Sequence, residues 1–188
     1  MRVATKVRTW TVDEYHQMLK VGILAADEHV ELLSGQILEM SPQQPPHAAT
    51  TRRASRYLDR RLEDLADVRT QLPITLRPNS EPEPDIAIVR FDANDYANRH
   101  PSSDEIFWIV EISDTTLRKD REQKAQVYAK AGIPEYWILD INLRQAYILR
   151  NPNDEGYRSE MSLTLTDSVF SLAFPTLEIS LANLFLPG

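Results

Sequence analysis

The chain has 188 residues, of which 42% are hydrophobic and 26% are charged, as expected for one soluble globular domain with a packed core. This composition excludes collagen-like, low-complexity and wholly disordered chains. The absence of cysteine excludes disulfides, thiolate zinc sites and cysteine nucleophiles, so any metal must be held by carboxylate, imidazole or carbonyl groups.

The formal net charge of −7 argues against a protein that coats nucleic acid non-specifically, because that mode depends on an excess of lysine and arginine. The charges are nevertheless separated along the chain. Residues 77–111 carry eight acids against three bases, whereas residues 47–65 carry five arginines against three acids and residues 116–130 five bases against two acids. Such separation suits a carboxylate metal site flanked by basic surfaces, although chance clustering of surface charge produces it as well.

No stretch of the sequence has the roughly 18 uninterrupted apolar residues of a membrane span. The first ten residues also lack the apolar run of a signal peptide. We therefore expect a cytoplasmic protein that does not contact a membrane.

The first part of the chain contains two predicted helices and a hairpin. Thr11 and Glu14 have the spacing of a capping box, which predicts a short helix. Residues 29–33 and 36–40 are apolar runs separated by a Ser-Gly turn, so we expect them to pair. Residues from about 47 to 64 show helical periodicity. One face of this helix carries Ala54, Leu58, Leu62 and Leu65, and the opposite face carries Arg52, Arg56 and Arg60.

Most of a sheet is predicted to follow. Residues 67–77 alternate like a strand, and Pro73 makes this strand an edge candidate. Residues 84–91 and 105–113 are apolar, β-branched runs that predict two core strands. A second helix is expected from about Lys119 to Ala131, ended by Gly132.

The C-terminal part is predicted to complete the sheet. Residues 135–140 and 145–150 should form a hairpin, and further strand is expected from Tyr157 to the apolar SLANLF segment. The order of elements predicts a mixed α/β domain (α+β mixed sheet) in which the central helices cover the sheet.

Two carboxylates are predicted on the neighbouring core strands. Alternation places Glu111 on a covered face of its strand. The residues on this face are Phe107, Ile109, Glu111 and Ser113, and those on the opposite face are Ile106, Trp108, Val110 and Ile112. An ionised carboxylate in a core strand is expensive unless it is paired or metal-bound. Asp85 begins the preceding strand, so Asp85 and Glu111 could share one cation. The alternative is a solvated Asp85 and a Glu111 paired with an arginine.

Lys124 is the lysine of the second helix that points with its apolar residues. On a helical wheel, residues within about 60° of it are Leu117, Asp120, Val127, Tyr128 and Ala131, and those on the far side are Lys119, Gln123, Gln126 and Lys130. An inward ammonium needs an anionic partner. A lysine beside two carboxylates and a cation is the layout for metal-assisted phosphodiester hydrolysis. The alternative is an exposed pair of Asp120 and Lys124.

Five blocks of the chain carry a resemblance to a known family: VELLSGQILEMSPQQPPH, PEPDIAIV, WIVEISDTT, DREQKAQVYAKAGIPEYWILD and PTLEISLANLF. Together, from about Val30 to Leu186, they resemble the Uma-type restriction endonucleases, a family of the PD-(D/E)xK nuclease superfamily. The resemblance implies a single restriction-endonuclease-like domain over residues 1–188, with extra β-hairpins. Its core would span about 28–150, and residues 151–188 would form a C-terminal β extension.

The resemblance also implies roles for single residues. The superfamily's proline–aspartate falls on Pro84 and Asp85, its second acid on Glu111 and its lysine position on Ser113. Because EIS replaces the usual ExK here, the lysine function is expected at Lys124 instead.

Three further positions match the family as auxiliary residues: Glu31, His47 and Asp120, the last together with Tyr128 in the helix motif. Each has an alternative interpretation. Glu31 alternates with Val30 and Leu32 and would then face solvent, His47 would cap a helix, and Asp120 would be a charge partner near a helix N-terminus.

We therefore expect a magnesium-dependent DNA endonuclease, with manganese as a substitute ion. Asp85, Glu111 and the carbonyl of Ile112 would hold the metal, Lys124 would position or deprotonate water, and Glu31 would assist. The arginines at positions 52, 56 and 60 form either a DNA-backbone track or a solvated face. A homodimer is expected because cutting both strands needs two sites.

The alternative is an inactive nuclease-fold module that serves as a nucleic-acid-binding or protein-interaction scaffold, with Ser113 as the sign of lost activity. A carboxylate-pair hydrolase acting on sugars ranks last, since the sequence shows no aromatic platform for a sugar.

Overall fold

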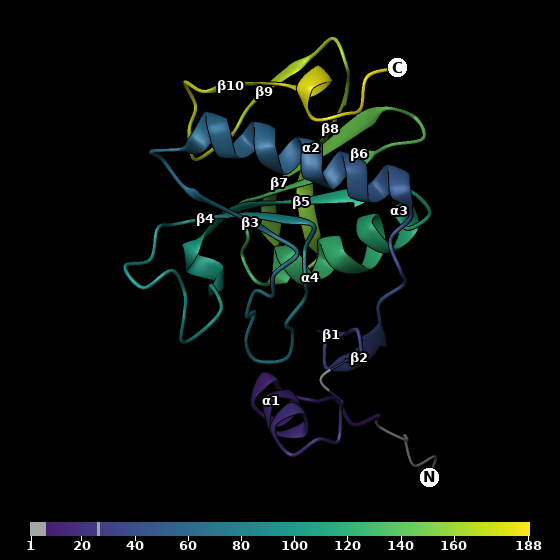
Figure 1. The fold of residues 1–188 in the computed structure, drawn as a ribbon, viewed down its shortest axis with the longest axis vertical. Helices are drawn as coiled ribbons and strands as arrows, with labels where there is room; N and C mark the ends of the chain where they lie inside the picture. The colour runs from purple at the N-terminus through teal and green to yellow at the C-terminus, as the bar shows by residue number, and fades with distance from the viewer. Residues whose placement is uncertain (1–6, 26) are drawn as a thin grey trace.

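A six-stranded sheet, with helices on both faces, forms the centre of the molecule (Figure 1). The structure is a computed structural model that describes residues 7–25 and 27–188. In spatial order the strands are β3 (Asp67–Thr70), β4 (Ile86–Val89), β5 (Ile106–Ser113), β6 (Glu135–Asp140), β7 (Gln145–Asn153) and β8 (Gly156–Thr164). Neighbours are antiparallel except β5 and β6, which are parallel. The predicted mixed α+β sheet is confirmed.

Two helical segments cover the two faces of the sheet (Figure 1). On one face α2 (Pro45–Leu62) packs Ala54, Leu58 and Leu62 against the strands, as its periodicity predicts. The other face is covered by a continuous segment of α3 (Leu117–Lys119), the π-helical η2 (Asp120–Lys124) and α4 (Ala125–Lys130). Because β5 and β6 are parallel, their connection must cross over the sheet, and this segment makes the crossing.

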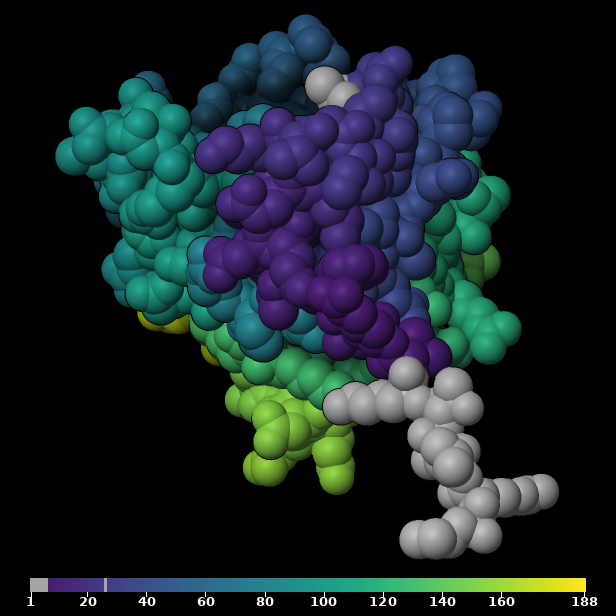
Figure 2. Space-filling model, turned by 90° about the horizontal axis from the view of Figure 1, so that it is seen from below, coloured from purple at the N-terminus to yellow at the C-terminus, as the bar shows by residue number. Residues whose placement is uncertain are grey.

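The N-terminal part forms a small unit beside the sheet. The helix α1 (Val12–Lys20) begins with the predicted capping box of Thr11 and Glu14. The predicted hairpin is formed by β1 (Val30–Leu33) and β2 (Gln36–Glu39). Seen from below, these N-terminal residues spread over one end of the molecule (Figure 2). Their position brings β1 beside the segment that precedes β4, where Leu32 bridges to Glu81.

The C-terminal residues lie on the outer side of α2 (Figure 1). They form β9 (Ser168–Phe170), β10 (Glu178–Ser180) and the 3-10 helix η3 (Leu181–Asn183); another 3-10 helix, η1 (Ser103–Glu105), precedes β5. Much of the SLANLF segment, for which further strand was expected, is therefore helical. Among the described residues, no helix has the length and hydropathy needed to cross a bilayer.

Three predicted boundaries in and after α2 are wrong. This helix begins at Pro45 rather than His47, because proline suits the first helical turn, and it ends at Leu62 rather than Asp64. Leu65 therefore lies outside the helix and is 45% exposed. The strand expected over 67–77 stops at Thr70, since Gln71 adopts a left-handed φ of 52°. Its predicted position at the edge of the sheet is confirmed.

The alternation predicted for β5 is wrong at its beginning. A register shift makes Val89 pair with Ile106 and Ile88 with Trp108, so one residue of β5 bulges out. Ile106 consequently packs on the face covered by α4, whereas Phe107 packs on the face covered by α2. Beyond the bulge the predicted alternation holds, and Glu111 lies on the α4 side.

Candidate active site

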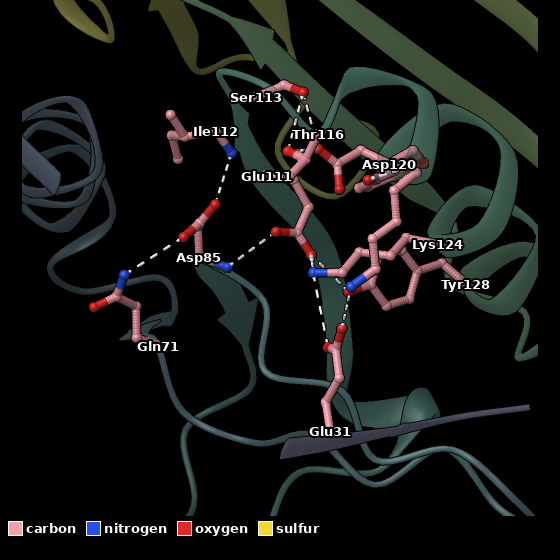
Figure 3. Close-up of polar contacts among 12 residues, drawn as sticks. Glu31, Gln71, Asp85, Glu111, Ile112, Ser113, Thr116, Asp120, Lys124 and Tyr128 are labelled. Atoms are coloured by element: carbon pink, nitrogen blue, oxygen red, sulfur yellow. Dashed lines mark hydrogen bonds and ion pairs between the residues drawn. The ribbon is translucent and has the colours of Figure 1, made fainter. Parts of the chain in front are cut away.

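Four buried side chains meet at the end of the sheet where β5 ends and β4 begins (Figure 3). Asp85 directly precedes β4, and Glu111 lies near the end of β5. Lys124 reaches in from the end of η2, and Glu31 comes from β1. We call these four residues, which sequence reasoning had singled out, the acid–lysine cluster.

The carboxylate of Asp85 is held by three groups. Its Oδ2 accepts a 2.8 Å hydrogen bond from the N–H of Ile112 and lies 3.1 Å from Nε2 of His47. Its Oδ1 accepts a long 3.5 Å bond from the side-chain amide of Gln71. Burial alone would raise the pKa of Asp85. The hydrogen bond and charge of His47 lower the pKa by more than burial raises it, so the pKa lies below its ordinary value. Asp85 is therefore an anion at neutral pH.

Glu111 is bound mainly through one oxygen. Its Oε1 accepts hydrogen bonds from Nζ of Lys124 and from the hydroxyl of Tyr128, each 2.8 Å long. Its Oε2 accepts only a 3.4 Å bond from the N–H of Asp85. Burial raises the pKa of Glu111 to about 8. The charge of Lys124 opposes this rise, and the charge of Asp85 adds to it. A further cation beside Oε2 would lower this pKa again.

Lys124 is buried, as the helical wheel predicts, and it links two acids. Its Nζ donates to Oε1 of Glu111 at 2.8 Å and lies 3.9 Å from Oε2 of Glu31. Burial alone would lower the pKa of Lys124, but the charges of Glu111 and Glu31 raise it above its ordinary value. The exposed Asp120–Lys124 pair is thus excluded, and Lys124 acts as a fixed positive charge.

Glu31 does not face solvent: it is only 1% exposed. Its Oε1 accepts a 2.8 Å hydrogen bond from Nζ of Lys119. Its Oε2 has no hydrogen-bond partner among the described residues and points into the cluster (Figure 3). One oxygen of Glu31 is therefore held while the other stays available.

Lys119 is the site residue that sequence reasoning missed. The helical wheel placed it on the far side of the helix from Lys124, because five residues at 100° each leave them about 140° apart. The segment between them is π-helical, with the N–H of Ala125 donating to the carbonyl of Asp120 five residues earlier. A wider turn brings residues five apart onto one side. Both lysines can therefore reach Glu31.

His47 stands against Asp85 from the first turns of α2. Its Nε2 lies 3.1 Å from Oδ2 of Asp85. Burial lowers the pKa of His47, but the hydrogen bond and charge of Asp85 outweigh it, and the pKa lies above its ordinary value. The imidazole of His47 thus already occupies the place beside Asp85 where a cation was expected.

The carbonyl of Ile112 faces the side of β5 on which Asp85 lies. The N–H of Ile112 points to Oδ2 of Asp85, and the N–H and C=O of a strand residue point to the same edge. The pairing of Ile86 with Val110, continued by two residues, places Pro84 opposite Ile112. Proline has no N–H to donate, so the ladder supplies no donor for this carbonyl.

Ser113 and Asp120 form a separate network next to the cluster. Asp120 Oδ2 accepts hydrogen bonds from Ser113 Oγ at 2.9 Å and from Thr116 Oγ1 at 2.7 Å. Burial raises the pKa of Asp120. Ser113 does not contact Asp85 or Glu111, and its hydroxyl ties the end of β5 to the helical segment that carries Lys124.

The remaining predicted residues lie elsewhere. Arg52, Arg56 and Arg60 are exposed along α2 and make no contact with the acid–lysine cluster. Within residues 7–25 and 27–188, no three His, Asp or Glu side chains are arranged as a complete metal centre. Any metal would therefore depend on two carboxylates, a backbone carbonyl and non-protein ligands.

Comparison with known proteins agrees with this architecture. The family Uma2, described as "Putative restriction endonuclease", matches residues 12–182. A crystal structure of a protein from Anabaena variabilis, described as a putative nuclease belonging to DUF820, superposes with a TM-score of 0.72 at 17% sequence identity. The match covers 93% of this chain and 97% of the other. No curated protein matches the chain.

The fold is thus that of a nuclease-like α+β protein, with one acid directly before β4, one acid near the end of β5 and a lysine from the helical segment that follows β5. The chain belongs to the Uma2 family, because the match spans most of its length. The predicted family resemblance is confirmed, and the family supports a nuclease function.

Proposed function

We propose that the protein is a metal-dependent endonuclease that hydrolyses phosphodiester bonds of DNA. The observation that carries the proposal is the acid–lysine cluster, in which Lys124 bonds Glu111 at 2.8 Å while Asp85 lies beside Glu111. Burying an ammonium and three carboxyl groups costs stability, and groups buried in this way cluster at functional sites.

The donor atoms suit a hard divalent cation. Asp85 and Glu111 supply carboxylate oxygens, and the carbonyl of Ile112 has no ladder donor. Magnesium is commonly bound through one or two carboxylates and water rather than by an all-protein cage. His47 lies against Asp85, and the charge of Asp85 raises the pKa of its imidazole, which supports a cation at this position. When bound, magnesium would supply Lewis-acid polarisation of the phosphoryl group and acidify a water.

The other side chains of the cluster have separate roles in the proposed reaction. Lys124 stays protonated, so it stabilises negative charge that develops on the phosphoryl oxygens and positions water rather than removing its proton. Tyr128 and Lys124 together fix the orientation of Glu111. Glu31, with Oε2 free, can orient a water or accept its proton.

The scaffold alternative rests on Ser113 in place of the usual lysine. In this structure Lys124 supplies the ammonium at Glu111, so the substitution does not leave the acids without a lysine. Catalysis therefore explains the buried cluster better than a scaffold does. The proposal also carries three expectations over from the sequence: DNA as the substrate, a homodimer and a cytoplasmic location.

The experiment is cleavage of supercoiled and linear DNA with magnesium or manganese, compared with EDTA. We expect wild-type cleavage only with metal, and a loss of about a hundredfold or more in Asp85→Asn and Lys124→Met. Lys130→Met, on the exposed side of α4, should cleave like wild type. Thermal melts identify variants that fail to fold.

Absence of cleavage by the wild type, or undiminished cleavage by a folded Asp85→Asn, would overturn the proposal. Calorimetric titration with manganese distinguishes the nuclease from the scaffold alternative. A nuclease should bind the ion through Asp85 and Glu111, whereas a scaffold has no need to do so.

A further inference from the structure

A groove of about 400 Å³ runs along the outer side of α2, between this helix and the C-terminal residues. Four arginines line it, and Tyr57 and Asn183 add polar groups; no acidic residue lines it. We call it the arginine groove, after Arg52, Arg53, Arg56 and Arg60. It is separate from the acid–lysine cluster.

The charge of the arginine groove is not neutralised by the protein. None of its four guanidinium groups forms an ion pair within the described part of the chain. The Nε of Arg53 is buried without a hydrogen-bond partner. By contrast, Arg61 on the same helix donates to the carbonyl of Glu178 at 2.9 Å. An unpaired positive groove in a chain of net charge −7 is complementary to an anionic partner.

The spacing of the arginines fits a polymer of phosphates. Arg52, Arg56 and Arg60 are four residues apart, so they follow each other at about 6 Å along the helix and span about 12 Å. One nucleic-acid strand presents a phosphate about every 3.4 Å of duplex axis, so the span matches three to four nucleotides. Guanidinium groups bind phosphate with two parallel hydrogen bonds.

The arginine groove and the acid–lysine cluster are both reached from α2, so one nucleic-acid strand could contact both. His47 contacts Asp85 from the beginning of α2, and the arginines follow five to thirteen residues later on this helix. This corresponds to about 7 to 20 Å along the helix axis, and a bound strand must also pass around α2, which is about 10 Å across, because the arginines lie on its outer side. A strand bound at Asp85 could therefore extend toward the arginine groove.

We infer that the arginine groove binds the phosphodiester backbone of the nucleic acid a few nucleotides from the cleaved bond; this inference rests on the proposed nuclease function. The bound group is the phosphate, so binding there is independent of base sequence. The groove thus supplies the positive charge that the overall composition lacks.

The test measures binding of a fluorescent DNA duplex of about 20 base pairs in EDTA, as a function of salt. The variant is the triple substitution Arg52→Ser, Arg56→Ser and Arg60→Ser. The control is the triple substitution Lys20→Ser, Lys130→Ser and Arg158→Ser, which removes the same charge from exposed positions outside the groove.

Three lost phosphate contacts should reduce the slope of log affinity against log salt by about 2.7. Between about 50 and 200 mM salt, the wild type should then lose affinity by a factor about 40 times larger than the groove variant does. The control should keep the wild-type slope. Equal slopes for the wild type and the groove variant would overturn the inference.

Two comparisons separate this inference from the proposed nuclease. If the wild type cleaves DNA but the groove variant binds it normally, the groove assignment fails and the nuclease stands. If Asp85→Asn still cleaves while the groove variant loses binding, the catalytic assignment fails and the groove stands. Loss of a dimer in the groove variant, with unchanged DNA binding, would overturn the inference in favour of an acidic second copy as the occupant.

Discussion

Nζ of Lys119 donates a 2.8 Å hydrogen bond to Oε1 of Glu31, across 88 residues of sequence. The bond joins the covering helical segment to the N-terminal hairpin. It holds one oxygen of Glu31 and leaves Oε2 facing Lys124 at 3.9 Å. Lys119 is therefore a positioning residue for Glu31.

Lys119→Ala should lower the cleavage rate by about tenfold, because Glu31 loses the bond that fixes its orientation. Lys119→Arg should recover much of that loss, since it restores a cationic donor. The unfolding free energy of Lys119→Ala should fall by about 1–3 kcal/mol, the usual effect of leaving a buried acceptor unpaired. Single-turnover cleavage and urea melts measure both quantities.

The matched control is Lys130→Ala, an exposed lysine on α4. It should leave both the rate and the stability at wild-type values. A purely structural role for Lys119 would appear as reduced stability with an unchanged rate, and this outcome would contradict the positioning role.

His47→Ala should increase the stabilisation of the protein by manganese. In the wild type the imidazole lies 3.1 Å from Oδ2 of Asp85, so a metal must displace it. The variant leaves Asp85 without this partner and should be less stable in EDTA, yet its melting temperature should rise more than that of the wild type as manganese is added. Thermal melts over a manganese titration measure the difference.

His16→Ala is the control, because His16 pairs with Glu81 at 2.7 Å rather than with Asp85. Its response to manganese should equal that of the wild type. An identical response in His47→Ala would show that His47 and the metal do not compete.

Glu111 should make the metal-free protein less stable as pH rises. Its pKa is raised by burial from an ordinary 4.5 to about 8, so the folded state binds the proton more tightly than the unfolded state. The stability contributed by this proton is complete below about pH 4.5 and is lost as pH rises through about 8. In EDTA, the wild type should therefore lose unfolding free energy relative to Glu111→Gln between about pH 5 and pH 9. Urea melts that change in parallel for the two proteins would contradict this.

The main parts of the cluster could be predicted because they obey regular periodicity. Strand alternation placed Glu111 on a covered face, and the helical wheel placed Lys124 inward; both side chains are buried. Glu111 lies within the regular strand β5, and Lys124 directly precedes the regular helix α4. Two acids and one lysine from three separate segments were thus singled out before any contact was known, and the family resemblance added Glu31.

The failures occur where the backbone departs from regular geometry. The π-helical turn brought Lys119 to Glu31, the bulge in β5 exchanged the faces of Ile106 and Phe107, and a left-handed Gln71 ended β3. Each is set by tertiary packing rather than by local propensity. The burial of Glu31 likewise depends on how the hairpin docks, which its alternation with Val30 and Leu32 could not reveal.

The most direct test of the proposed site is anomalous diffraction from crystals soaked in manganese. We expect one peak bounded by the carboxylates of Asp85 and Glu111 and the carbonyl of Ile112, with the ring of His47 moved away from Asp85. An absent peak there, or a peak that leaves Asp85 and Glu111 untouched, would contradict it.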